Sequence, residues 1–156
     1  MQRSKHLEPL SHDHFEGLLV AKRIRAGLAG GASAGTVAAY VGHFWEHYLT
    51  RHFRQEEELL LPLASATGAD ALGERMADEH RSLRDLAAAL REEGPARRML
   101  LETFAAKLKD HIRFEERELF PALEQRADEA DLARVSEQLQ AAHVDADLEW
   151  DPPFWE

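Results

Sequence analysis

The sequence predicts an all-α fold: an up-down-up-down four-helix bundle with a short fifth helix at the C-terminus. Ala, Leu, Glu and Arg, which are strong helix formers, are abundant, whereas β-branched residues are few. Most Gly and Pro residues fall between segments whose apolar residues recur with helical spacing. The chain of 156 residues is long enough for one domain with a buried core.

Five helical segments are expected, separated by breaks of small or turn-forming residues. They span residues 11–28, 36–61, 71–92, 96–124 and 131–148. Ser11 and Asp70 are the expected N-caps of the first and third helices. Pro62 is expected to end the second helix, and Pro121 to bend or end the fourth. The domain organisation that follows is an N-terminal extension (1–10), the bundle (11–126), and a C-terminal helix with an aromatic tail (127–156).

The composition excludes several classes of function. With 29 acidic and 19 basic residues the formal charge is −10, which argues against a general nucleic-acid or anionic-membrane binder. The absence of Cys excludes disulfides, thiolate zinc sites and iron–sulfur clusters. No run of 18 apolar residues predicts a transmembrane helix, and the first residues lack the apolar stretch of a secretory signal. We therefore expect a cytoplasmic protein.

An internal repeat carries the candidate chemistry. The segment from His52 to Pro62 aligns with that from His111 to Pro121, and both read His-x-x-x-Glu-Glu with Leu at the ninth position. On a helical wheel the His and the first Glu of each copy share the apolar face, which pairs His52 with Glu56 and His111 with Glu115. The second and fourth helices of such a bundle run parallel, so the two pairs should lie at the same height in its core.

Carboxylates buried there need positive charge nearby, and no Arg shares these faces. Imidazole and carboxylate together suit iron and similar first-row ions. The first and third helices add His14 and His80, each directly after an acidic residue. Four imidazoles and two bridging carboxylates would supply about eight bonds to two ions, and a bridging oxo or hydroxo group about two more. About one position per ion then stays open for a small ligand.

The other histidines and acids are weaker candidates. His12 lies about 200° around the helix from His14, which is preferred because it follows an acid and shares a face with Leu18. Further ligation by three histidines is left open: His6, His12 and His143. Two histidines are expected at the surface, His43 and His47. Three acids are expected to face solvent, Glu57, Glu58 and Glu116, whereas Glu118 is placed where it could orient an imidazole.

The spaced combination of these motifs resembles the hemerythrin-like family, the HHE cation-binding domain. The matching residues are Asp13-His14, His52-x-x-x-Glu56-Glu57, Glu79-His80, and His111-x-x-x-Glu115-Glu116 with Leu119-Phe120-Pro121. The resemblance implies a bundle that holds two non-heme iron ions with a bridging oxo or hydroxo group. Its implied ligands are His14, His52, Glu56, His80, His111 and Glu115.

Two departures narrow the function that the resemblance implies. Oxygen-carrying hemerythrins have His-x-x-x-His on the third helix, whereas Met76 and Arg84 stand four residues before and after His80 here. The iron–sulfur repair proteins of the wider family carry Cys, which this chain lacks. We therefore expect a di-iron protein that binds or senses O2, NO or peroxide, rather than an enzyme.

Two alternatives are a peroxide-reducing di-iron enzyme and a metal-free helical interaction module. The expected ligand is a small diatomic molecule or peroxide. The aromatic tail with Phe154 and Trp155 is expected to pack either on the bundle or on a partner, which would be a second copy or another protein.

Overall fold

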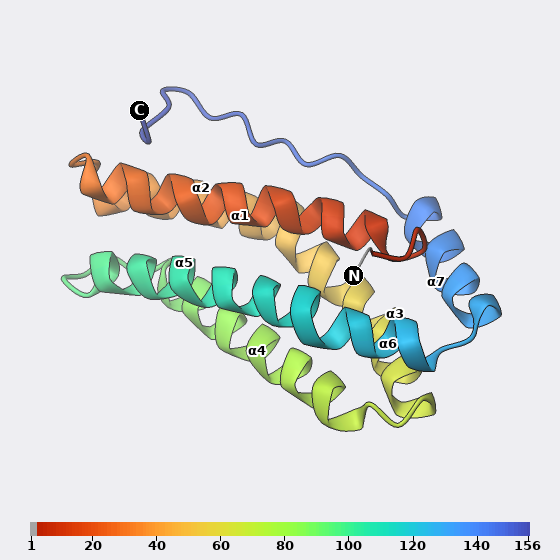
Figure 1. The fold of residues 1–156 in the computed structure, drawn as a ribbon. Helices are drawn as coiled ribbons and strands as arrows, with labels where there is room; N and C mark the ends of the chain where they lie inside the picture. Colours follow the sequence, from red (N-terminus) through yellow and green to blue (C-terminus); the bar gives the residue numbers. More distant parts are fainter. Residues whose placement is uncertain (1–2) are drawn as a thin grey trace.

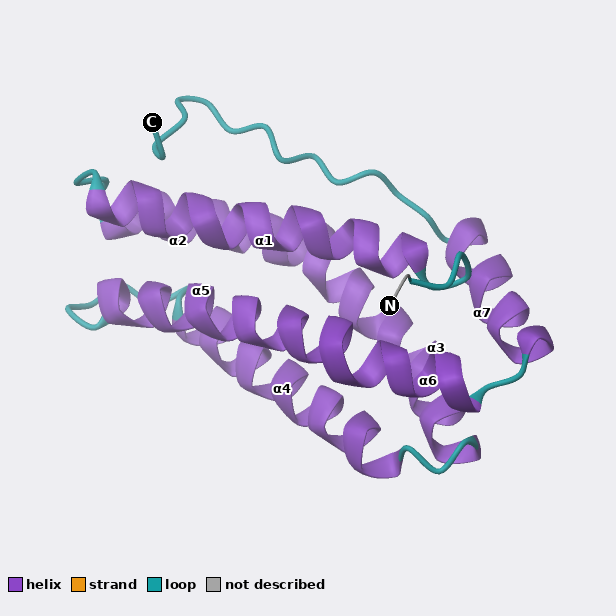
Figure 2. Ribbon diagram, in the orientation of Figure 1, coloured by secondary structure: helices purple, strands orange, loops and turns teal. Residues whose placement is uncertain are grey.

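A computed structural model describes residues 3–156 and confirms the predicted fold class: a helical bundle with a short C-terminal helix and, between residues 3 and 156, no strand (Figures 1 and 2). Residues 1 and 2 of the expected N-terminal extension lie outside the described residues. The helices are α1 (Glu8–Ala29), α2 (Ala34–Phe44), α3 (Thr50–Ala66), α4 (Asp70–Ala89), α5 (Arg97–Phe114), α6 (Phe120–Arg126) and α7 (Glu129–Ala141). None of the helices in this range is both long and apolar enough to cross a membrane.

The bundle consists of four helical rods. Two of them are the single helices α1 and α4, and each of the other two consists of two helices joined by a π-helical turn. The turn η1 (Trp45–Leu49) joins α2 to α3, and η2 (Glu115–Leu119) joins α5 to α6. α1 packs most extensively against α5, while α4 contacts both α3 and α5. α7 crosses one end of the bundle, and the chain after it returns along α1 and α2 (Figure 1).

Two apolar clusters fill the interior. One contains Val20, Phe44, Phe53 and Leu108 and occupies the half nearer the α1–α2 turn. The other contains Leu10, Leu60 and Met76 and occupies the half nearer α7. On each rod the predicted site residues lie where residues of one cluster give way to residues of the other. The packing of the core therefore leaves one polar layer in the middle of the bundle.

Several predicted helix ends are wrong. α1 starts at Glu8 with Pro9 in its first turn, so Ser11 is inside the helix and Leu7 is its N-cap. α4 begins with Asp70 itself and has Ala69 as its N-cap. α3 continues through Pro62 to Ala66, because burial of Leu63 and Ala64 outweighs the backbone hydrogen bond that proline removes.

The last helix is also shorter than predicted. The Asp128 side chain caps α7, accepting a hydrogen bond from the backbone N–H of Asp131 at 2.9 Å, and the helix ends at Ala141. The acidic residues that follow oppose the helix dipole. The chain after α7 is held against α1 by Arg23, which donates a hydrogen bond to the Leu148 carbonyl at 2.7 Å.

The aromatic tail packs on the bundle itself. The Trp155 ring lies 4.0 Å from the Arg23 guanidinium, and the Tyr40 ring contacts both Phe154 and Trp155. Gly27 makes this docking possible, since a Cβ added there would lie 2.4 Å from the Phe154 ring.

Replacing Gly27 with Ala is therefore expected to detach the tail. The overlap should cost about 1–3 kcal/mol of docking free energy. Limited proteolysis should cut the chain after residue 142 faster in this variant. Gly42→Ala, where the added Cβ meets nothing within 4 Å, is the control. Equal cleavage of both variants would contradict the proposed role of Gly27.

Candidate metal centre

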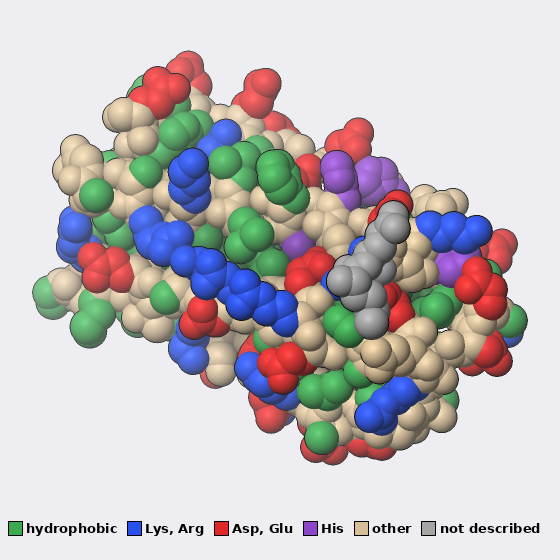
Figure 3. All heavy atoms as spheres, in the orientation of Figure 1, with side chains coloured by type: hydrophobic (Ala, Val, Ile, Leu, Met, Phe, Trp, Pro, Cys, Tyr) green, Lys and Arg blue, Asp and Glu red, His purple; other side chains and the backbone are tan. Residues whose placement is uncertain are grey.

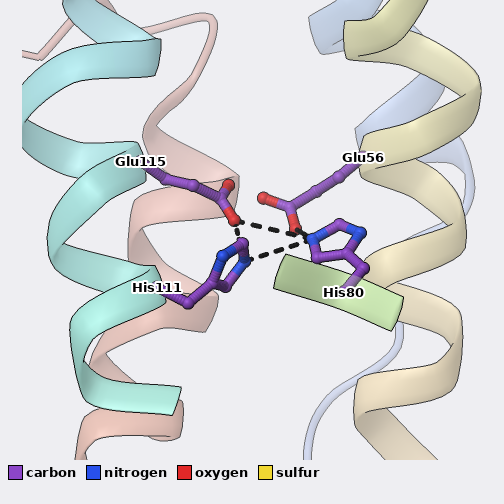
Figure 4. A group of neighbouring side chains, drawn as sticks. All are labelled: Glu56, His80, His111 and Glu115. Carbon is purple, nitrogen blue, oxygen red and sulfur yellow. Dashed lines mark hydrogen bonds and ion pairs between the residues drawn. The ribbon is translucent and has the colours of Figure 1, made fainter. Parts of the chain in front are cut away.

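All six predicted ligands meet in the polar layer. His14 comes from α1, His52 and Glu56 from α3, His80 from α4, His111 from α5 and Glu115 from the start of η2. Each is buried, and Glu56, His80 and Glu115 are 0% exposed. Figure 4 shows four of them converging from three rods.

The Glu56 carboxylate lies at the centre of the cluster. Its Oε1 is 3.2 Å from Nε2 of both His52 and His80, and its Oε2 is 3.5 Å from Nε2 of His14. First-row ions bind nitrogen and oxygen at about 2.0–2.2 Å, so two ligands of one ion are about 3.0–3.5 Å apart. The separations around Glu56 fall in this range.

Glu115 faces the same space from the opposite rod. Its Oε1 contacts His111 and lies 3.7 Å from Nε2 of His80, while its Oε2 lies 3.7 Å from Nε2 of His14. Nε2 of His80 and Nε2 of His111 are 3.1 Å apart. Two groups of donors are close enough to share an ion: Glu56, His80, His111 and Glu115 in one, and His14, His52 and Glu56 in the other. Glu56 belongs to both.

Four outer carboxylates face the other nitrogen, Nδ1, of the imidazoles. Nδ1 of His52 is 3.1 Å from Asp13, and Nδ1 of His111 is 2.8 Å from Glu79. A hydrogen at Nδ1 donated to a carboxylate leaves Nε2 with its lone pair toward the centre, which is the tautomer that a metal requires.

The second pair of outer carboxylates comes from the repeats themselves. Nδ1 of His14 is 2.7 Å from Glu116, whereas Nδ1 of His80 is 3.6 Å from Glu57, longer than a hydrogen bond. Both Nη atoms of Arg84 hold the Glu57 carboxylate in place. Aromatic rings fix two of the imidazoles further, because Phe120 stacks on His14 and Phe53 on His80.

The sequence-based assignment of the acidic neighbours is therefore partly wrong. Glu57 and Glu116 do not simply face solvent, while Glu58 is exposed as predicted. Glu118 does not orient an imidazole; its side chain is 52% exposed and pairs with Arg75. The π turn η2 explains this difference, because its extra residue per turn rotates Glu118 away from the site.

The sequence analysis did not assign Asp13 and Glu79 the role of orienting an imidazole. Each of them stands directly before a site histidine, and this repeated position is the signal that could have identified them.

The remaining histidines lie outside the cluster. His12 is exposed, and the rings of His6 and His143 bind Glu129 and Asp145. His47 is exposed as predicted, whereas His43 is half-buried against Trp150. The choice of His14 over His12 is consistent with burial, although one reason for it was wrong: Leu18 is 37% exposed.

The donor set fits a metal pair. Both carboxylate oxygens of Glu56 and of Glu115, together with Nε2 of His14, are buried with no hydrogen-bond partner among the described residues. An unpaired buried carboxylate costs several kcal/mol, so these oxygens need a cation or a proton. If every imidazole donates through Nδ1, the lone pairs of His80 and His111 point at each other, which an ion between them would resolve.

Without metal, protons on the imidazoles supply the positive charge beside the two carboxylates. Burial alone would lower the pKa of His111, but the Glu115 carboxylate outweighs it and raises the pKa to about 10. The pKa of His52 is likewise held well above its ordinary value, mainly by Glu56 against the effect of burial. Burial would raise the pKa of Glu56, but His52 and the neighbouring donors hold it well below its ordinary value.

The metal-free chain is therefore expected to lose stability as the pH rises. A raised histidine pKa contributes stability that is complete below its unfolded value of 6.5 and is lost as the pH passes through the folded value, about 10 for His111. Between pH 6.5 and about pH 9 the free energy of unfolding should fall by about 2–3 kcal/mol. Urea denaturation in the presence of a chelator measures this change in the free energy of unfolding. With metal bound the trend should reverse, because ligation needs neutral imidazoles. Metal-free stability that rises over this range would contradict the assignment.

The outer carboxylates can be tested with a matched pair of variants, because Arg75 binds both Glu79 and Glu118. Glu79→Gln should weaken metal affinity about 10–100-fold, since the amide no longer holds the His111 tautomer by a charged hydrogen bond. Glu118→Gln should leave affinity unchanged. Competition with a chelator measures both, and equal affinities would show that Glu79 has no role in the site.

One family model matches the chain, that of the Hemerythrin HHE cation binding domain, over residues 10–123 and 71–148. No curated protein and no solved structure matches.

Proposed function

The chain belongs to the hemerythrin HHE cation-binding family, and from this premise we propose that it is a non-heme di-iron protein that binds or senses a small ligand such as O2, NO or peroxide. The observation that carries the proposal is the pair of buried carboxylates, Glu56 and Glu115, none of whose four oxygens has a hydrogen-bond partner within residues 3–156. Two groups of donors that share Glu56 could each hold a metal ion, and Glu56 would contribute a carboxylate oxygen to either of them.

Iron is the proposed metal because the donors are imidazole and carboxylate without thiolate. When bound, such a pair supplies a one-electron change at each ion and a vacant position for an external ligand. The group with His14 and His52 has fewer protein donors than the other, so it would leave more room for an external ligand.

The surrounding residues restrict what can reach the site. All six ligands are at most 5% exposed. A cavity of about 20 Å3 is lined by His52 and Asp13 and, from α7 and the residues after it, by Leu139, Ala142 and Val144. This volume suits about one water-sized molecule, which favours a small ligand over an organic substrate.

A peroxide-reducing enzyme is the second candidate. On α4, Met76 is buried among apolar residues and Arg84 binds Glu57, so neither replaces the second histidine of the oxygen carriers. This departure favours chemistry other than oxygen carriage. A metal-free interaction module is disfavoured by the unpaired carboxylates. The cytoplasmic location and a protein partner stay predictions.

The proposal predicts about two irons per chain and near-ultraviolet absorption from oxygen-to-iron charge transfer. His52→Ala should remove most of the metal and destabilise the fold by about 3–5 kcal/mol, because Glu56 would remain buried without compensation. His47→Ala, an exposed histidine one turn earlier, is the control.

Metal analysis, the absorption spectrum and urea denaturation measure these effects. Cooperative folding of the wild-type chain without bound metal after iron is supplied would contradict the proposal. Consumption of peroxide beyond one equivalent per site would favour the enzyme over the binding protein.

A further inference from the structure

Two histidines on the rod that contains α2 and α3 take no part in the metal centre. His43 lies near the end of α2 and His47 lies in η1, and the centroids of their rings are 4.5 Å apart. Residues four apart lie on one face of a helix, so the two rings face the same space. Nothing in the proposed di-iron chemistry uses this pair.

The separation of the two rings is that of a pair that can share an ion. In the metal centre, the rings of His80 and His111 have centroids 4.8 Å apart, and their Nε2 atoms are 3.1 Å apart. The rings of His43 and His47 are slightly closer, with planes inclined at 46°. A rotation of either side chain is enough to bring one nitrogen of each ring to about 3.0–3.5 Å, the separation of two ligands on one ion.

An ion in solution can reach this pair. Both histidines line an open surface cavity of about 580 Å3. His47 is exposed, whereas His43 is half-buried, and the ring of Trp150 in the docked tail packs against it at 5.5 Å. A Cβ added to Gly42, which lines the same cavity, would meet nothing within 4 Å. The cavity therefore leaves room for an ion with its bound water beside one fixed and one mobile imidazole.

The sequence from His43 to His47 reads His-x-x-Glu-His, and Glu46 also lines the cavity. Two histidines four residues apart on a helix, with a glutamate between them, bind zinc in metalloenzymes. Those enzymes have a third protein ligand. Neither His43 nor His47 belongs to a group of three donors close enough to share an ion within residues 3–156. Two imidazoles would therefore hold the ion, and solvent would complete its coordination.

The charge around the pair favours selection by nitrogen donors. Arg91 and Arg97, where α4 joins α5, line the cavity together with the single carboxylate of Glu46. Arg97 is engaged elsewhere, because its Nη2 donates to the Leu90 carbonyl at 3.0 Å. A cavity that is not acidic is a poor site for magnesium or calcium, which prefer several oxygen ligands. Neutral imidazoles instead bind late first-row ions through their lone pairs.

From this arrangement we propose that His43 and His47 form a second metal site, which binds one divalent ion of zinc or copper. Both ions suit imidazole, and their affinity for a given site exceeds that of iron(II). The site is independent of the proposed di-iron function, because it shares no residue with the metal centre.

Copper(II) is the probe, because nitrogen ligands give its electron paramagnetic resonance spectrum a hyperfine splitting. The iron-loaded full chain, without a polyhistidine tag, should bind about one copper(II) ion with this splitting and keep its iron. Zinc(II) should compete for the same position. His43→Ala and His47→Ala should each weaken copper(II) binding at least about tenfold, since loss of even an outer contact to a ligand costs about 10–100-fold. His12→Ala, which removes an exposed histidine of α1, is the control and should leave the affinity unchanged.

Loose association with surface carboxylates has to be separated from this site. The formal charge is −10, and Figure 3 shows acidic side chains scattered over the face on which α1 and α5 lie. Excess magnesium(II) displaces ions held by carboxylates but not an ion held by two imidazoles. Equal copper(II) affinities of wild type and His47→Ala in excess magnesium(II) would overturn the proposal. If the chain takes up no iron, the proposed function fails, whereas the loss of one copper(II) equivalent in the double variant of His43 and His47 still tests this site.

Discussion

The burial of two carboxylates in the middle of an apolar bundle is the constraint on which the rest of the structure depends. Glu56 and Glu115 are completely buried, and none of their oxygens has a hydrogen-bond partner within the described part of the chain. Isolated ionised groups in such surroundings are strongly unfavourable, so positive charge must lie against them. Four imidazole nitrogens converge on these two side chains, and their geometry suits cations between them. The two apolar clusters enclose this layer on either side.

The outer carboxylates join the site to the fold. Asp13 on α1 holds His52 on α3, and Glu79 on α4 holds His111 on α5. Glu116, in η2, reaches back to His14 on α1. Each contact fixes an imidazole tautomer and also crosslinks two helices, so the position of the helices and the direction of the metal-facing lone pairs are determined together. Such networks contribute more to the uniqueness of the arrangement than to net stability.

Much of this could be predicted from the sequence. The repeat of His-x-x-x-Glu on two helices, combined with helical periodicity, indicated four of the six residues that meet in the core. The histidines that directly follow an acidic residue on the other two helices, His14 and His80, completed the set. Periodicity reports the direction of a side chain from its own helix, and that was sufficient for residues at the centre of the bundle.

The features that were missed depend on contacts between helices. Glu57 does not share the core-facing side of α3 with Glu56, and it lies near His80 only because α4 packs beside α3. The π turn η2 carries no clear sequence signal, yet Glu118 lies in it and its side chain faces solvent rather than the site. Continuation of α3 past Pro62, and docking of the tail through Gly27, likewise result from tertiary packing that local propensities do not contain.

The most direct test is a crystal structure of the iron-supplied chain, with anomalous diffraction recorded on both sides of the iron absorption edge. The account predicts two anomalous peaks, one near His14 and His52 and the other near His80 and His111, with the Glu56 carboxylate between them. Ordinary solvent density at these positions, or imidazoles turned away from the centre, would contradict it.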